Sequence, residues 1–68
     1  MEQEAFNLSV RKFLKMVGVR SQHEIEEAVA KAIASGAITG VETLPATMTL
    51  KVPALRLEVE FDAQIDLK

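Results

Sequence analysis

The chain has 68 residues, no cysteine and a formal net charge of −2 at pH 7, and 49% of its residues are hydrophobic. This composition indicates one small folded domain over residues 1–68, and it excludes a disulfide framework, a thiolate metal site and a general attraction to nucleic acid or anionic lipid. A chain of this length hides only about 60% of its unfolded surface, so a lone monomer is marginally stable and self-association is favoured.

The first predicted element is a helix over residues 5–17. Its apolar residues recur at helical spacings and fall on one face; they are Phe6, Val10, Phe13, Leu14 and Val17. Gly18 follows, where a left-handed helix end is easiest for a residue without Cβ. We therefore expect this helix to end before Gly18.

A second helix is predicted over residues 22–35. Ser21 stands three positions before Glu24, the spacing at which a hydroxyl and a carboxylate cap a helix start. Apolar residues continue at helical spacing to Gly36, which ends the element; they are Ile25, Ala28, Val29, Ala32 and Ile33. The first half of the chain therefore predicts a helical hairpin.

The second half predicts strands. Between Gly36 and Ala46, Gly40 and Pro45 interrupt any long element, so we expect a packed connection with at most one helical turn or a short strand. From Thr47 the apolar residues alternate with polar ones, which predicts strands over residues 47–52 and 57–61.

The turn between these strands has two candidate lengths. Either a two-residue loop at Pro53 and Ala54 or a four-residue loop from Pro53 to Arg56 keeps the apolar side chains on one face. We prefer the four-residue loop, because proline does not fit the first position of a primed turn and because this loop sets Lys51 opposite Glu58. A further loop at residues 62–64 then predicts a short third strand over residues 65–67.

These elements give an α+β fold. Two helices form a hairpin, and a two- to three-stranded antiparallel meander follows, with its apolar face covered by the helices. We expect a homodimer, formed either by the strand edges or by the alanine-rich face of the helix over residues 22–35. The outer sheet edge near Leu55 and Arg56 is the candidate site for a protein partner.

Side chains for catalysis are scarce. The chain has one histidine, three serines, no cysteine and no tyrosine, and His23 faces solvent on the helical wheel. Its carboxylates lack the spacing of a metal cluster, and no cofactor-binding motif occurs. We therefore expect no enzyme activity, no cofactor and no metal site.

Four cations give the only local charge bias, and they form a candidate contact for nucleic acid or another anionic partner. They are Arg11, Lys12, Lys15 and Arg20. A helix-turn-helix fits poorly, because the second helix begins with Glu24, Glu26 and Glu27, which would repel phosphates. Nucleic acid is not the expected partner, and a solvated helix face is the preferred interpretation of these cations.

The acidic start of the chain is unlike the basic start of a secretory signal, and no apolar run reaches the roughly 20 residues that span a bilayer. We therefore expect a cytoplasmic protein with no membrane partner.

Longer strings of the sequence resemble a known family. The segments FNLSVRKFLKMVGVRSQHEIEEAV (Phe6 to Val29), LPATMTL (Leu44 to Leu50) and EFDAQIDL are similar to a small bacterial family of unknown function, chiefly proteobacterial, with the signature FNxSVRKFLKxVGVxSQxEIE. The resemblance implies an α+β domain and a dimer, and it supplies no reaction, ligand or catalytic residue. We therefore expect a small self-associating interaction or structural module, with weak nucleic-acid binding as the alternative.

Overall fold

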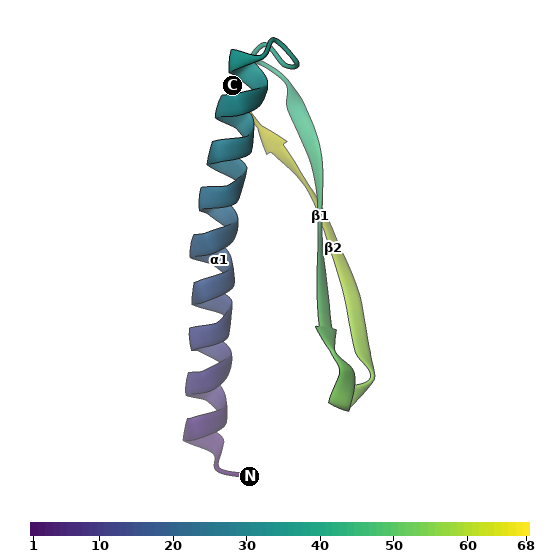
Figure 1. The fold of residues 1–68 in the computed structure, drawn as a ribbon. Helices are drawn as coiled ribbons and strands as arrows, with labels where there is room; N and C mark the ends of the chain where they lie inside the picture. The colour runs from purple at the N-terminus through teal and green to yellow at the C-terminus, as the bar shows by residue number, and fades with distance from the viewer. The chain divides into compact units, whose positions relative to one another are not determined.

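The structure is a computed structural model that describes residues 1–68. One helix, α1 (Gln3–Ala34), precedes a hairpin of β1 (Thr43–Val52) and β2 (Leu57–Asp66), whose strands are joined by the short 3₁₀ turn η1 (Pro53–Leu55) (Figure 1). The chain divides into two compact units, Met1–Ala37 and Ile38–Lys68, and each is described here by itself. The α+β composition is as expected. The helical hairpin and the third strand are wrong, and the single domain over residues 1–68 stays a prediction.

Residues 3–34 form one continuous helix of 32 residues instead of two shorter ones. Gly18 does not adopt the positive φ of a left-handed helix end, which among the glycines is found at Gly36 and Gly40. An interior glycine costs only about 1 kcal/mol relative to alanine. A break would leave backbone groups unpaired and would require a second helix nucleus. The helix therefore continues through Gly18.

The caps of α1 lie at its true ends, so the predicted cap at Ser21 is wrong. The carboxylate of Glu2 accepts hydrogen bonds from the backbone N–H groups of Glu4 at 3.1 Å and Ala5 at 2.7 Å. At the other end Gly36 has a φ of 80°, and its N–H donates to the carbonyl of Ile33 at 3.1 Å. The N–H of Ala37 donates to the carbonyl of Ala32 at 2.9 Å, which completes a Schellman motif. The predicted helix end at Gly36 is confirmed.

The hairpin has the predicted four-residue turn. Val52 pairs with Leu57, and Lys51 pairs with Glu58, with 3.8 Å between the lysine Nζ and the carboxylate. Arg56 closes the turn in the left-handed region with a φ of 52°, and its N–H donates to the carbonyl of Pro53 at 3.0 Å.

Both strands are longer than predicted. β1 begins at Thr43 instead of residue 47, and β2 continues through residues 62–64, where a loop was expected. The N–H of Leu67 donates to the carbonyl of Glu42 at 3.0 Å, and alternation from this pair places Pro45 and Gln64 at a non-hydrogen-bonded position. Pro45 therefore loses no ladder hydrogen bond, and β1 extends through it.

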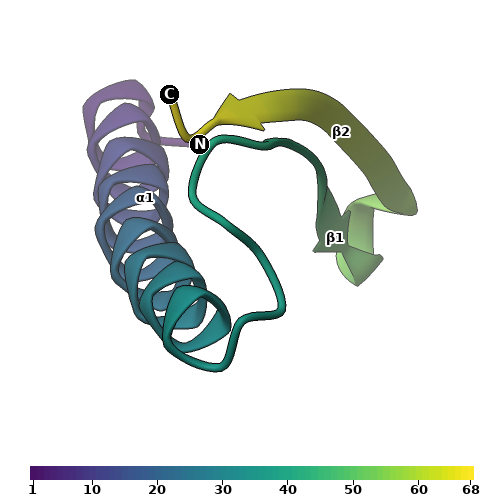
Figure 2. The ribbon, with the colours of Figure 1, turned by 90° about the horizontal axis from the view of Figure 1, so that it is seen from above.

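The segment between the helix and β1 has neither helical nor strand structure (Figure 2). Glu42 organises its end, because its carboxylate accepts hydrogen bonds from the N–H groups of Thr39 at 2.8 Å, Gly40 at 2.9 Å and Val41 at 3.1 Å. The hydroxyl of Thr39 donates to the same carboxylate at 3.1 Å. The short connection is thus held by one side chain.

Candidate interaction surfaces

Neither unit has a core of its own, because no side chain of the chain is buried. A two-stranded hairpin is at best marginally stable alone in water, and most helix stability in proteins comes from packing of an apolar face. The apolar surfaces of the two units are therefore the first candidates for a functional site.

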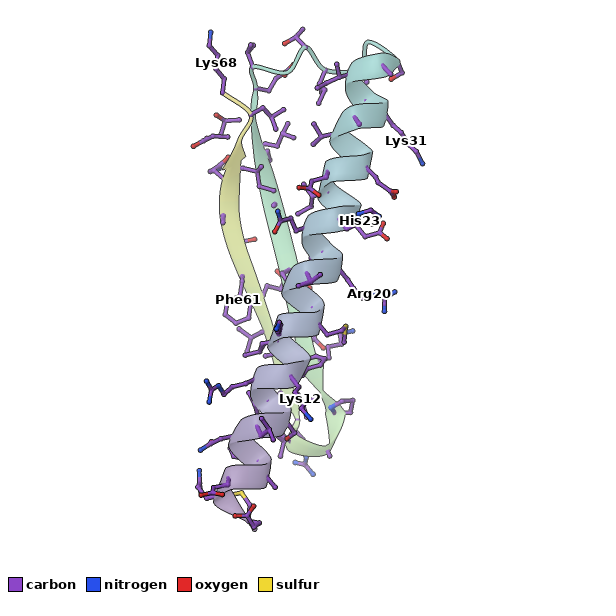
Figure 3. The ribbon with its side chains drawn as sticks, turned by 90° about the vertical axis from the view of Figure 1, so that its left-hand side faces the viewer. Lys12, Arg20, His23, Lys31, Phe61 and Lys68 are labelled. Atoms are coloured by element: carbon purple, nitrogen blue, oxygen red, sulfur yellow. The ribbon has the colours of Figure 1, made fainter.

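The strand register places ten apolar side chains on one face of the hairpin. Paired residues of an antiparallel ladder point to the same side, and every apolar residue of β1 pairs with an apolar residue of β2. At mid-hairpin, Phe61 is 56% exposed (Figure 3). We call this surface the hairpin apolar face; it consists of Leu44, Ala46, Met48, Leu50, Val52, Leu57, Val59, Phe61, Ala63 and Ile65.

The opposite side of the hairpin carries threonines on β1 and carboxylates on β2. The hydroxyl of Thr43 donates to Asp66 at 3.0 Å, and that of Thr47 donates to Asp62 at 2.8 Å. These hydrogen bonds join directly opposed residues and support the register. The two strand faces therefore differ sharply in polarity.

A second apolar surface runs along α1. At about 100° per residue, seven positions fall within roughly 80° of the helix circumference. One of them, Leu14, is 55% exposed. We call this surface the α1 stripe; it consists of Val10, Leu14, Val17, Ser21, Ile25, Ala28 and Ala32. It crosses the position at which two helices were expected to meet.

The four candidate cations lie between residues 11 and 20 of α1. Arg11, Lys12, Lys15 and Arg20 spread over roughly 180° of the helix circumference at 100° per residue. In Figure 3 the side chains of Arg20, His23 and Lys31 extend from the same side of the helix. The structure thus places these four cations on one helix without gathering them into a narrow patch.

His23 is exposed, as expected, with 68% of its side chain accessible. Its Nε2 lies 3.2 Å from Glu27, one helical turn later, and Gln22 donates to Glu26 at 3.2 Å in the same way. These contacts are ordinary helix-surface pairs. They engage two of the three glutamates that follow the basic segment.

Leu55 and Arg56 belong to the turn at the tip of the hairpin. Leu55 is the last residue of η1 and is 71% exposed, and Arg56 follows it in the left-handed conformation. Neither residue lies within a strand, so a partner at this site would contact the tip of the hairpin.

Glu42 is the one group whose acidity the structure changes clearly. Hydrogen bonds from the backbone N–H of Thr39 first, and then from Gly40, Glu42 itself and the Thr39 hydroxyl, lower the pKa of Glu42 from 4.5 to about 2, although partial desolvation opposes them. The sequence analysis missed this role. The sequence signal for this role was the carboxylate of Glu42, which stands two positions after the pair Thr39 and Gly40.

No group of three or more histidine, aspartate or glutamate side chains is placed to hold a metal ion. The helix lacks an apolar stretch of the length and hydropathy that crossing a bilayer requires. Comparisons with curated proteins and with solved structures find no match. A family model does match, over residues 1–68, and the chain belongs to that family of unknown function (DUF6494).

Proposed function

We propose that this chain is a small self-associating interaction module and not an enzyme. The observation that carries the proposal is the absence of any buried side chain in a chain with two well-formed apolar surfaces. Burying apolar area contributes about 25 cal/mol per Å², and association with another copy is one way in which a marginal small domain buries it. In this proposal the module acts in the cytoplasm.

Nucleic-acid binding is not part of the proposal. The four cations spread widely around α1, and Glu24, Glu26 and Glu27 follow on the same helix. A phosphate backbone that contacted the cations would approach these carboxylates as well. No observation favours this second function over the first.

The test compares two substitutions that add the same charge to opposite sides of α1. Leu14→Glu places a carboxylate on the α1 stripe, and Leu8→Glu places one on the other side of the helix, at a residue of similar exposure. We expect sedimentation velocity to show an assembly for the wild type and for Leu8→Glu, and at least a tenfold weaker assembly for Leu14→Glu.

Circular dichroism reports whether each variant keeps its helix. If Leu14→Glu fails to fold, the milder Leu14→Ala takes its place. A wild type that sediments as a monomer at every concentration contradicts the proposal.

A further inference from the structure

We propose that two copies of the chain associate through the α1 stripe, with the helices antiparallel and Ser21 of each copy at a two-fold axis. This inference rests on the proposed self-association and specifies its surface and orientation. A two-fold interface uses one patch on both copies, so the patch must be complementary to itself. The α1 stripe meets this condition in spacing, in side-chain size and in charge.

The spacing of the stripe is the same in both directions from Ser21. Its other members stand 4, 7 and 11 positions before Ser21 and 4, 7 and 11 positions after it. A two-fold axis through Ser21 therefore sets every stripe residue opposite a stripe residue of the second copy. Helix geometry alone places positions at these offsets on one face, and in this chain all six of them are apolar.

The sizes of the opposed side chains are also complementary. The axis places Val10 opposite Ala32 of the second copy, and Leu14 opposite Ala28 of the second copy. In these two pairs a large residue faces a small one, which allows the helix backbones to approach closely while the contact stays filled. The third pair, Val17 and Ile25 of the second copy, joins two branched apolar residues. In a parallel pair Leu14 would face Leu14, and Ala28 would face Ala28.

The charges of α1 favour the same orientation. Residues 11–20 carry four cations and no acid, whereas residues 22–31 carry three glutamates and one lysine. An antiparallel pair sets each basic segment beside an acidic segment of the second copy. A parallel pair sets each segment beside its own charge type, which is unfavourable.

Arg20 and Glu24 provide a specific contact. They lie on the same side of the stripe, and neither takes part in an ion pair within the chain, whose two ion pairs are His23–Glu27 and Lys51–Glu58. The two-fold axis places Arg20 and Glu24 of the second copy about 3 Å apart along the helix direction, because each residue advances the helix by about 1.5 Å. Two symmetric Arg–Glu pairs therefore flank Ser21.

The strand edges are poorer interfaces. The outer edge of β1 contains Pro45, whose missing N–H interrupts pairing with another strand. Pairing β2 with a second β2 brings like charges together; its polar side carries Glu58, Glu60, Asp62 and Asp66. Of the two interfaces expected from the sequence, strand edge or helix, the structure favours the helix.

Single-cysteine variants test the orientation, because the chain has no cysteine of its own. Val10→Cys and Ala32→Cys are mixed and oxidised, and each is also oxidised alone. We expect cross-linked heterodimer in the mixture and little cross-linking in either variant alone, because like positions lie about 33 Å apart at 1.5 Å per residue.

The matched control uses Lys12→Cys mixed with Ala30→Cys. These positions have the same axial relation about Ser21 but lie on the opposite side of the helix from the stripe. We expect at least tenfold less cross-linking in this mixture. Equal cross-linking in the two mixtures would overturn the inference.

A charge exchange gives a second readout without cysteine. Arg20→Glu should weaken the dimer about tenfold, since both symmetric contacts become repulsive, and adding Glu24→Arg should restore it. No restoration would count against the Arg20–Glu24 contact and the proposed register.

The outcomes separate this inference from the proposed function. An assembly in which Val10→Cys cross-links to itself is parallel, and an assembly without stripe cross-links uses another surface. Either result overturns the inference and leaves self-association standing. A chain that is monomeric throughout overturns both.

Discussion

At the scale of single residues, Glu42 has the most defined chemistry in the chain. Three backbone N–H groups and one hydroxyl converge on its carboxylate and lower its pKa to about 2. Because the pKa is lower in the folded state than the ordinary 4.5, the carboxylate stabilises the folded connection above about pH 4.5, and this contribution is lost as the pH falls from 4.5 through 2.

We expect the amide proton shifts of Thr39 and Gly40 to titrate together with a midpoint near pH 2, because both amides donate to Glu42. Glu42→Gln should remove this titration and weaken the protection of both amides from exchange. NMR spectra collected from pH 1.5 to pH 6 check this expectation. A shared midpoint near 4.5 would show that the hydrogen bonds do not hold the carboxylate.

Two glycines with different backbone conformations give a second prediction at this scale. A Cβ at Gly18 meets open space in a continuous helix, so Gly18→Ala should stabilise the fold by about 1 kcal/mol. Gly36 has a φ of 80°, so Gly36→Ala should destabilise it by about 1–2 kcal/mol. Thermal unfolding followed by circular dichroism checks both. A Gly18→Ala variant that melts earlier would support a helix break at Gly18.

At the scale of elements, the hairpin is continuous where a third strand was expected. Thr43 lies opposite Asp66, and Pro45 lies opposite Gln64. We expect strong Hα–Hα nuclear Overhauser effects at both pairs, since Cα atoms at non-hydrogen-bonded positions are only about 4.5 Å apart. The pair Thr49–Glu60 serves as the internal control, because both topologies contain it. Contacts between Phe61 and Ile65 across a turn would instead indicate the meander.

The elements show which parts of the fold were readable from sequence. The alternation in both strands and the Lys51–Glu58 charge pair were sufficient to fix the hairpin turn. The end of α1 at Gly36 was equally readable, because the left-handed conformation needs a residue without Cβ.

Other parts depended on context that the sequence pattern did not carry. Gly18 is also suited to a left-handed end, and only the continuity of helical hydrogen bonding decides against one. Pro45 breaks a strand at one ladder position and not at the next, so its effect depends on the register. Residues 62–64 are typical of a loop, yet Ala63 keeps the alternation and the strand continues.

The candidate site residues also fall into those that were readable from sequence and those that depended on structural context. His23 was correctly placed in solvent, and Arg11, Lys12 and Lys15 were correctly placed in a helix. Arg20 was expected between two helices and lies within α1. The spread of the four cations around the helix and the symmetry of the α1 stripe depend on residues 5–34 being one helix. Two helices joined at Gly18 would have divided that stripe, so it was not visible beforehand.

At the scale of the whole molecule, stability and assembly are expected to be coupled. Neither unit buries a side chain, so covering the apolar surfaces contributes to folding itself. We therefore expect the melting temperature to rise with protein concentration, by several degrees between micromolar and hundred-micromolar samples. Differential scanning fluorimetry over that range checks it. A melting temperature that does not depend on concentration would indicate a fold that is complete without association.

The molar mass in solution tests self-association most directly. Light scattering on the wild-type chain, over a concentration series that begins at about one micromolar, compares the measured mass with the 7.5 kDa of a single copy. We expect about twice that mass, as an antiparallel α1 pair requires. A mass of one copy at every concentration would contradict the account, because both apolar surfaces would then be covered within one chain.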